Sequence, residues 1–431
     1  MLHNCYGIND KGHFTLGGAD TVELAKKYGT PLYLIDENKV RESIRVYTSA
    51  MKKYMREGST IHYASKALSF KGIYPIMNEE GIGVDLCSCG EIYTALKGGF
   101  PAERACFHGN NKTDTELRFA LEHKIGEIVV DSFEELDALD RIAGELGIIQ
   151  KIFLRITPNI DCHTLKAVST GQLDSKFGTP IETGEAGRLV KNALEKKNLI
   201  LCGYHCHCGS QVFESKPYIE QTDVMFGFAA DMMNKTGYAP EFMDLGGGFG
   251  VKYVEGDPEI DIGANIKAIA DRVKELCEKY SLPLPKILLE PGRSIVAAAG
   301  VTLYTVGAVK SIENYRTYVS IDGGMGDNPR YALYGSLYEV LIANKATLPK
   351  DTSVTVAGRY CESGDLIGEN MRLQKAERGD ILAVTVTGAY NYSMASNYNR
   401  VPRPALVMIR DGLDRLSVKR ESFEDLTSND L

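Results

Sequence analysis

The stretch that decides the fold is His62-Tyr63-Ala64-Ser65-Lys66-Ala67. Residues 60–64 alternate with the period of two that is typical of a β-strand, and Lys66 stands just past them. A lysine is costly to bury, so a lysine at the mouth of a buried strand indicates a task for its amine. One such task is a Schiff base with an aldehyde, because a desolvated amine loses its proton more readily. On these six residues alone, a solvated lysine at a strand end is the alternative.

The composition limits the classes of protein to which this chain can belong. The chain has 431 residues, of which 44% are hydrophobic and 25% charged, so we expect an ordinary globular protein of two domains. A net charge of −8 argues against a nucleic-acid partner, which would need a basic surface. No apolar run has the length of a membrane span and no signal-peptide pattern opens the chain, so no membrane partner is expected. Ten cysteines without the spacing of a disulfide framework favour a reducing compartment, and we expect a cytoplasmic protein.

Short apolar runs alternate with amphipathic segments on both sides of the opening stretch. After Ile61–Ala64 the runs are Gly83–Leu86, Ala105–His108, Glu127–Val130, Ile152–Ile156, Ile200–His207, Phe242–Leu245 and Ile287–Leu289. Eight β units separated by helices predict an α/β fold with a (β/α)₈ TIM-type barrel over residues 37–298. Residues 157–180 have no hydrophobic period, and a loop of that length in a compact domain predicts a lid.

The sequence changes character after the barrel. Apolar runs there are separated by turns instead of helices, and they are Val301–Lys310, Arg316–Ile321, Ser353–Val356, Ile381–Val386 and Ala405–Arg410. This pattern predicts a C-terminal all-β domain over residues 299–431, with a helix only near Leu337–Asn344. Residues 1–36 contain short strands around a helix at Thr21–Tyr28. Because these strands cannot belong to the barrel count, we expect the segment to pack with the β domain.

Two turns near the end of the barrel carry unusual residues. Gly246-Gly247-Gly248 follows the seventh run, and Glu290-Pro291-Gly292-Arg293 follows the eighth. In such a barrel the active site lies at the C-terminal ends of the strands, and phosphate often binds after strands seven and eight. Consecutive glycines let backbone N–H groups approach an anion without interference from a Cβ atom. Each turn also has a plainer interpretation, which is an ordinary turn for the glycines and an internal salt bridge for the second motif.

The sixth run contains many possible metal ligands. Strand alternation places its histidines on one face and its cysteines on the other. The first face carries His205 and His207, and the second carries Cys202, Tyr204, Cys206 and Cys208. Since the ligands are split, we expect no metal.

Three loops of the predicted β domain are crowded with tyrosine, arginine and glycine. They are residues 322–327, with Arg330 and Tyr334 just after them, residues 359–365 and residues 388–394. This composition is more typical of a ligand wall than of hairpin tips. Taken alone, a thiol such as that of Cys361 is more often a buried small residue than a catalyst.

Together these motifs resemble those of the fold-type III pyridoxal-phosphate decarboxylases, and within them the diaminopimelate decarboxylases. The resemblance covers nearly the whole chain. Its motifs are Tyr63-Ala-Ser-Lys66-Ala, Gly83-Val-Asp85, His108-Gly-Asn-Asn-Lys112, Ser175-Lys-Phe-Gly178, His205-x-His207-x-Gly-Ser210-Gln211, the triple glycine, Glu290-Pro-Gly-Arg293, Cys361-Glu362-Ser-Gly-Asp365 and Gly388-Ala-Tyr390.

The resemblance implies pyridoxal 5′-phosphate (PLP) as cofactor. Lys66 would hold it as a Schiff base, His207 would stack on its pyridine ring, and Cys361 would be the proton donor. The whole cofactor set would be Lys66, Asp85, His207, Ser210, Gly247, Gly248, Glu290, Pro291, Gly292, Arg293 and Tyr390. The substrate set would be Arg293, Arg330, Tyr334, Glu362 and Tyr390. In such enzymes the loop with Cys361 and Glu362 reaches the site of the partner subunit, so the resemblance implies a homodimer with shared active sites.

The implied reaction is the decarboxylation of meso-2,6-diaminopimelate to L-lysine and CO₂, the final step of lysine biosynthesis. Glu290 opposite the ring nitrogen would favour the protonated, electron-accepting ring. Racemases of the same fold have an arginine there, so Glu290 favours a decarboxylase. Glu362 and Arg330 would meet the ammonium and the carboxylate at the far end of the substrate.

Several alternatives stay open at the level of sequence. They are a related decarboxylase acting on D-lysine, D-ornithine or carboxynorspermidine, an amino-acid racemase, and a non-catalytic regulatory protein of the PLP fold. Retention of Lys66, Glu290 and Cys361 speaks against the last of these. Tyr331, where the family usually has proline, and Leu68, where it often has asparagine, leave the fine substrate preference open.

Overall fold

The computed structural model describes residues 1–160 and 174–431. Most of the lid predicted at 157–180 lies outside the described residues. The chain divides into two compact units. The barrel unit comprises Ile44–Gly250 and Glu259–Gly292, and the β unit comprises Met1–Ser43, Val251–Pro258 and Arg293–Leu431. The domain boundaries expected from the sequence stay a prediction, and each unit is described by its own ranges.

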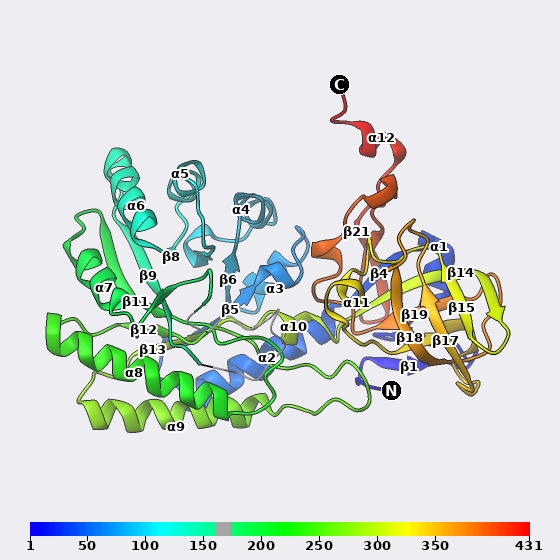
Figure 1. Cartoon of the computed structure of the whole chain (residues 1–431), viewed down its shortest axis with the longest axis horizontal. Coiled ribbons are helices and arrows are strands. Elements are labelled where there is room, and N and C mark those ends of the chain that lie inside the picture. Colours follow the sequence, from blue (N-terminus) through cyan, green and yellow to red (C-terminus); the bar gives the residue numbers. More distant parts are fainter. Residues whose placement is uncertain (161–173) are drawn as a thin grey trace. The chain divides into compact units, whose positions relative to one another are not determined.

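The barrel unit is built on a closed parallel sheet (Figure 1). Its strands are β5 (Thr60–Ala64), β6 (Gly83–Leu86), β7 (Ala105–Phe107), β8 (Glu127–Val130), β9 (Gln150–Thr157), β11 (Leu199–His205), β12 (Phe242–Asp244) and β13 (Lys286–Leu289). Each strand pairs with the next, and β13 pairs with β5 to close the ring, while β10 (Thr179–Pro180) adds to β9. All eight runs predicted from the sequence are strands of this ring, which confirms the TIM-type barrel.

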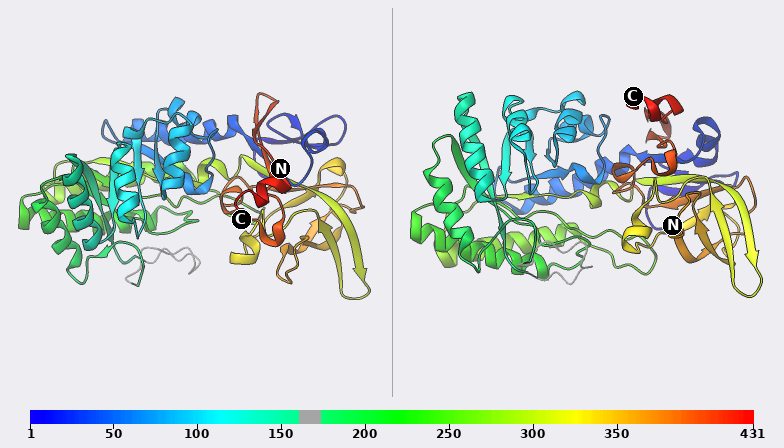
Figure 2. Two further views of the ribbon diagram at one scale, coloured as in Figure 1. Left: turned by 90° about the horizontal axis from the view of Figure 1, so that it is seen from above. Right: turned by 45° about the horizontal axis from the view of Figure 1, so that its top comes forward.

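Helices follow the barrel strands and lie around them (Figures 1 and 2). They are α3 (Tyr74–Glu79), α4 (Cys89–Lys97), α5 (Asp114–Glu122), α6 (Phe133–Leu146), α7 (Glu185–Glu195), α8 (Lys216–Thr236) and α9 (Ile262–Tyr280), and α2 (Glu37–Tyr54) leads into β5. Their ends follow from local sequence: Thr113 and Glu116 form a capping box on α5, and Gly147 ends α6 in the left-handed conformation. None of the described helices is long and apolar enough to span a membrane.

An apolar layer crosses the inside of the barrel. It consists of Cys106, Val129, Phe153, Cys202 and Leu288, with Phe242 packed against it, and its members come from β7, β8, β9, β11, β12 and β13. The prediction that Cys202 lies on the face opposite His205 is wrong, because a register shift between Leu201 and Gly203 interrupts the strand alternation. Such layers of side chains from successive strands fill barrels of this kind. Polar groups further along the strands therefore lie in a water-poor interior.

The β unit is organised around a long sheet in which the order is β18-β17-β15-β14-β4-β20-β21. The strands are β4 (Leu32–Asp36), β14 (Gly300–Ile312), β15 (Arg316–Ile321), β17 (Thr352–Ala357), β18 (Leu366–Leu373), β19 (Ile381–Thr385), β20 (Ala405–Arg410) and β21 (Leu413–Val418). The N-terminal strand β4 pairs with both β14 and β20, as expected. A small sheet of β1 (Tyr6–Ile8), β2 (Phe14–Leu16) and β3 (Ala19–Asp20) precedes α1 (Thr21–Tyr28).

The helix predicted near Leu337–Asn344 is wrong. This segment contains strand β16 (Val340–Ile342) and a 3₁₀ turn at Ala343–Lys345. All three residues of β16 are buried, and they pair antiparallel with β19. A short apolar run fits a buried strand as well as a helix, and here the available partner strand decides. Three short helices complete the unit, α10 (Arg293–Val296), α11 (Arg330–Tyr334) and α12 (Phe423–Thr427).

Candidate active site

Lys66 lies in a 3₁₀ turn, Ser65–Ala67, directly after β5. The turn is fixed by its neighbours, because the Ser65 hydroxyl donates to Glu91 at 2.8 Å and the Tyr63 hydroxyl donates to the Leu68 carbonyl at 3.0 Å. The side chain of Lys66 is exposed at the mouth of the barrel. Lys66 thus lies at the strand end where the sequence places it. The described residues do not bury its amine, so they do not provide the desolvation that would help the amine to lose its proton.

The Glu290–Gly292 turn lies against the end of β5, beside the turn that carries Lys66. Ala64 donates its N–H to the Pro291 carbonyl at 3.2 Å. A Cβ atom on Gly292 would stand 2.9 Å from both the Cβ and the carbonyl oxygen of Ala64. Only a glycine at position 292 lets this turn lie so close to Ala64, because a Cβ atom would force the turn and the end of β5 apart.

The three glycines after β12 allow three loops to pack closely. A Cβ on Gly246, Gly247 or Gly248 would collide with a backbone carbonyl oxygen, at 2.6, 2.0 and 2.2 Å respectively. Those oxygens belong to Cys206, Glu290 and Gly209, which lie on the neighbouring loops. The N–H of Gly247 also donates to Nδ1 of His207 at 3.3 Å. Close packing is thus a second reason for the triple glycine, one that the sequence analysis did not give.

A row of alternating imidazoles and carboxylates fills the barrel interior behind this mouth. His62 Nδ1 lies 3.3 Å from Asp85 Oδ1, which lies 3.4 Å from His108 Nε2. His108 Nε2 is also 3.1 Å from Glu290 Oε1, and the other oxygen of Glu290 is hydrogen-bonded at 3.2 Å to Nε2 of His205. In the first three contacts the atoms are close enough to form ion pairs, but the angles do not suit hydrogen bonds. The atoms that form them have no hydrogen-bond partner among the described residues.

This row holds Glu290 ionised. Burial alone would raise the pKa of Glu290, but His205 and His108 outweigh it and hold the pKa well below its ordinary value. Burial would likewise raise the pKa of Asp85, with Glu290 adding to the effect, yet His108 and His62 keep that pKa low. The two carboxylates are therefore both charged although water is excluded.

The histidines of the site differ in charge. Burial would lower the pKa values of His62 and His108, but neighbouring acidic groups outweigh it and raise both well above the ordinary value. For His205 burial prevails and lowers the pKa to about 4. Burial also lowers the pKa of His207, with help from the charges of Lys66 and Arg155. His207 is therefore neutral at pH 7, as suits a ring that stacks on another ring.

Asp244, at the end of β12, is a buried acid next to this row. Burial, together with the charges of Glu290 and Asp85, raises its pKa well above the ordinary value. Its Oδ1 accepts the N–H of Gly246 at 2.8 Å. The environment thus neutralises Asp244 and leaves Glu290 as the charged carboxylate.

The β unit contains a second cluster, made of two buried arginines and the tyrosines around them. Arg293 donates a hydrogen bond to the hydroxyl of Tyr253 at 3.0 Å, and its guanidinium carbon lies 4.7 Å from the ring centre of Tyr390. Arg330 lies 5.5 Å from the ring centres of both Tyr334 and Tyr390 and donates to Ser336 at 3.2 Å. Its Nε is buried without a hydrogen-bond partner among the described residues. Tyr390 has φ = 61°, in the left-handed region that is uncommon for residues other than glycine.

The loop that carries Cys361 and Glu362 is exposed at its tip and anchored at its end. The buried carboxylate of Asp365 accepts the N–H groups of Met325 at 2.6 Å and Tyr360 at 2.7 Å. Cys361 donates its own N–H to Asn399 at 2.8 Å. The loop is therefore fixed at its base, while the thiol and the carboxylate at its tip are exposed.

The predicted residues are divided between the two units. Lys66, Asp85, His207, Ser210, Gly247, Gly248, Glu290, Pro291 and Gly292 belong to the barrel unit, and Arg293, Arg330, Tyr334, Cys361, Glu362 and Tyr390 belong to the β unit. Among the described residues of one chain, Glu362 and Arg330 make no contact with each other. Their joint role at the far end of a substrate stays a prediction.

Sequence reasoning missed several residues of these clusters. They are His62, His108 and Asp244 in the barrel unit, with His205 seen only as a histidine facing the mouth, and in the β unit Tyr253 and Tyr338, whose rings meet edge to face with their centres 5.5 Å apart. His62 lies on β5, where it pairs with Gly83 of β6, and Asp85 lies two residues further along β6. The register of these two strands is the signal that could have shown that His62 and Asp85 are close. Tyr253 follows the triple glycine closely, but only the fold places it beside Arg293.

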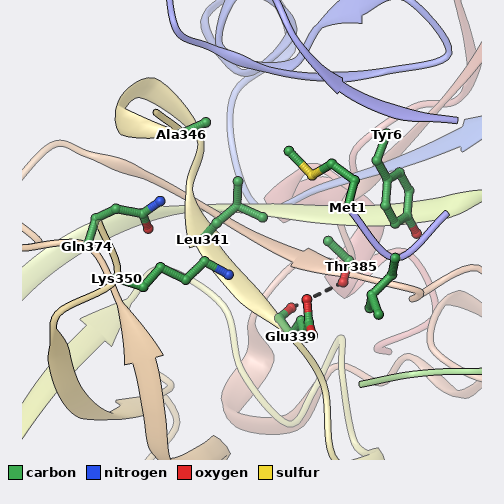
Figure 3. A pocket seen from close by; sticks show the side chains of 9 residues that line it. Met1, Tyr6, Glu339, Leu341, Ala346, Lys350, Gln374 and Thr385 are labelled. Carbon is green, nitrogen blue, oxygen red and sulfur yellow. Dashed lines mark hydrogen bonds between the residues drawn. The ribbon is translucent and has the colours of Figure 1, made fainter. Parts of the chain in front are cut away.

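Two cavities of the β unit contain none of the predicted site residues. The smaller, of about 70 Å³, is lined by Met1, Leu2, Tyr6, Glu339, Leu341, Ala346, Lys350, Gln374 and Thr385 (Figure 3). The larger, of about 400 Å³, shares Glu339 and Lys350 with it.

Comparison with known proteins shows the family to which the chain belongs. Residues 38–297 match the family described as pyridoxal-dependent decarboxylase, pyridoxal binding domain. The chain is 45% identical to a diaminopimelate decarboxylase of Bacillus methanolicus, over 97% of each chain. It is 43% identical to that of Bacillus subtilis, over 100% of this chain and 98% of the relative.

A solved structure is similar along the whole length. It is a diaminopimelate decarboxylase from M. jannaschii in complex with L-lysine, with a TM-score of 0.91, 35% identity, and coverage of 100% of this chain and 99% of the other. By sequence and by fold, this chain belongs to the pyridoxal-dependent decarboxylases, within the family of the diaminopimelate decarboxylases.

Proposed function

We propose that this protein decarboxylates meso-2,6-diaminopimelate to L-lysine and CO₂ with the help of PLP, as the final step of lysine biosynthesis. The observation that carries the proposal is the ionised Glu290, held by His108 and His205 at the end of β13. Its negative charge suits a protonated pyridine nitrogen, which is the electron-accepting form of the ring. Membership of the diaminopimelate decarboxylase family supports the choice of substrate.

The residues of the barrel mouth fit this cofactor. Lys66 offers an exposed amine, Glu290 a charged carboxylate, and His207 a neutral ring. Ser210, Gly247, Gly248 and the Gly292–Arg293 turn would hold the phosphate together with Tyr390. When bound, the ring supplies an electron sink for the pair of electrons that the departing CO₂ leaves on the α-carbon.

The chain's own residues do the rest. Glu290 would hold a proton at the ring nitrogen, and His207 would contact the ring. Arg293 and Arg330 bind carboxylate groups, which planar guanidinium groups recognise by paired hydrogen bonds. The Cα–carboxylate bond breaks, and Cys361 gives a proton to that carbon in its place.

We also infer a homodimer in which each site takes Cys361 and Glu362 from the partner subunit. Support comes from the exposed tip and anchored base of their loop. The exposed thiol must stay reduced to donate a proton, which favours the cytoplasm.

The decisive test is to incubate the purified protein with PLP and meso-diaminopimelate and to measure CO₂ and L-lysine. We expect equal amounts of the two products. D-lysine, D-ornithine and carboxynorspermidine serve as competing substrates, and faster turnover of one of them would replace the proposed substrate. Racemisation without CO₂, or no reaction with any of the four, would refute a decarboxylase.

A further inference from the structure

We propose that His62 is a positioning residue for the reaction: its imidazolium balances Asp85, so that His108 is left to serve Glu290 at the ring nitrogen of the cofactor. The proposal rests on the proposed function and adds a residue from the far end of the buried row.

His108 stands between two carboxylates. Its Nε2 lies 3.4 Å from Asp85 Oδ1 and 3.1 Å from Glu290 Oε1. A single imidazolium cannot neutralise two buried carboxylates, and an unbalanced buried charge is costly. Arg155 also acts on Glu290 but lies 4.0 Å from Asp131, which takes up part of its charge. The cation closest to Asp85 besides His108 is His62, which lies 3.3 Å from the same oxygen of Asp85.

The fold makes room for His62 at this place. His62 on β5 is paired with Gly83 on β6. A Cβ atom on Gly83 would stand only 2.3 Å from Cδ2 and 2.6 Å from Nε2 of the His62 ring. The imidazole thus occupies the space that the missing side chain leaves, and its approach to Asp85 is fixed by two neighbouring strands.

The other groups that face His62 are consistent with a positive charge. Asp85 faces it from β6, Cys106 from β7, and Glu127 from β8. Burial would lower the pKa of His62, but Asp85 and Cys106 outweigh it and raise that pKa well above the ordinary value. The row then reads cation, anion, cation, anion from His62 to Glu290, and its net charge is zero.

Removing the charge of His62 should change Glu290 without touching the cofactor. Asp85 would compete for His108, and Glu290 would lose part of its counter-charge and become harder to ionise. A less charged Glu290 gives a weaker hold on the proton of the ring nitrogen. We therefore expect the effect on the chemical step and not on substrate binding.

The test uses three variants. His62→Phe keeps a ring in the space beside Gly83 but removes the charge, and His62→Gln keeps a hydrogen-bond donor without a charge. Val129→Ala is the matched control, because Val129 lies in the apolar layer of the same barrel and carries no charge.

In protein loaded with ¹⁵N-labelled PLP, we expect the ring-nitrogen titration to move down by about one pH unit, or tenfold in proton affinity, in both His62 variants. With diaminopimelate, kcat should fall about tenfold and KM should stay within twofold. Val129→Ala should change neither.

A second readout needs no cofactor. In the apoprotein, ¹⁵N spectra of labelled histidine should show both nitrogens of His62 protonated at pH 7.5. A neutral His62, an unchanged ring-nitrogen titration in both His62 variants, or an equal shift in Val129→Ala would overturn the proposal. Stoichiometric zinc held by His62, Asp85 and Cys106 would overturn it as well. If PLP does not bind at all, the proposed function fails, while the apoprotein spectra still decide the charge of His62.

Discussion

Arg293 and Arg330 share one aromatic ring, since their guanidinium carbons lie 4.7 and 5.5 Å from the centre of Tyr390. Both are buried. Two buried guanidinium groups that pack on one ring favour an anionic partner, because each carries a positive charge away from water. A substrate with two carboxylates would offer such a partner at both ends, whereas its product would offer only one.

The first prediction concerns Arg330. Arg330→Ala should raise KM for diaminopimelate by roughly 100-fold, because a charged hydrogen bond to a carboxylate is worth about 2 to 3 kcal/mol. Inhibition by L-lysine should weaken much less, since lysine lacks the far carboxylate. Steady-state kinetics and lysine inhibition measure the two effects. Arg378→Ala, which removes an exposed arginine of the same unit, is the control. Equal weakening of both ligands would mean that Arg330 serves the near end or only the fold.

A second prediction concerns Glu290. Glu290→Gln should still bind PLP but lower kcat by about 100- to 1,000-fold, because the neutral amide no longer favours a proton on the ring nitrogen. Glu278→Gln, which changes an exposed glutamate on α9, should behave like the parent protein. Stopped assays of CO₂ release give kcat, and a decrease of only a few-fold would show that the ring nitrogen does not depend on this carboxylate.

The third prediction tests Lys66 as the attachment point. The protein with PLP should absorb visible light, and reduction with borohydride should fix the cofactor on the peptide that contains Lys66. Lys66→Ala should lose the fixed label, whereas Lys71→Ala, an exposed lysine five residues away, should keep it. Peptide mass spectrometry identifies the labelled lysine. A label on a lysine other than Lys66 would contradict the role of Lys66 as the attachment point.

Asp327 gives a prediction about stability and pH. Burial raises the pKa of Asp327 to about 7, although Tyr304 donates a hydrogen bond to it. Between the unfolded value near 4 and this folded value, the folded state binds more protons than the unfolded state, so stability falls as pH rises. The contribution of Asp327 to stability should therefore fall from about pH 4 to pH 7, so the Tm of the parent should fall over this range relative to the Tm of Asp327→Asn. Equal slopes in a pH series of melting curves would contradict the raised pKa.

The last prediction tests the shared site. Lys66→Ala and Cys361→Ala should each be nearly inactive alone. When equal amounts are unfolded together and reassembled, about half of the dimers should be mixed by random pairing. Each mixed dimer would have one intact site, so activity should recover to about a quarter of the parent value. Refolding each variant separately is the control. No recovery despite proven exchange of chains would place Cys361 and Lys66 in the same subunit or remove Cys361 from catalysis.

The barrel could be predicted from the sequence because its strands are buried on both faces. Each of the eight runs is a short apolar segment between amphipathic helices, and this local pattern is independent of the distant chain. The segment 337–344 lacked such a signal: three apolar residues pair with β19, and only the presence of that strand decides their conformation.

The candidate site could be predicted only in part, for a similar reason. Lys66, Glu290 and the glycines could be predicted because these residue types are unusual at the ends of strands. The row from His62 to His205 joins residues 62, 85, 108, 290 and 205, and their distances follow from the register of strands that lie far apart in sequence. Their protonation states depend on burial and on each other, so no single residue carries the signal.

The contact between Gly83 and His62 makes the history of these two positions interdependent. With His62 in place, any larger residue at 83 is excluded by the ring at 2.3 Å. If position 62 were small, the nearest remaining atom at 83 would be the carbonyl oxygen of Arg104 at 3.0 Å, a backbone contact that would still have to give by a few tenths of an ångström. A side chain at 83 is therefore best accommodated when position 62 is already small, and the buried histidine in turn needs a glycine at 83.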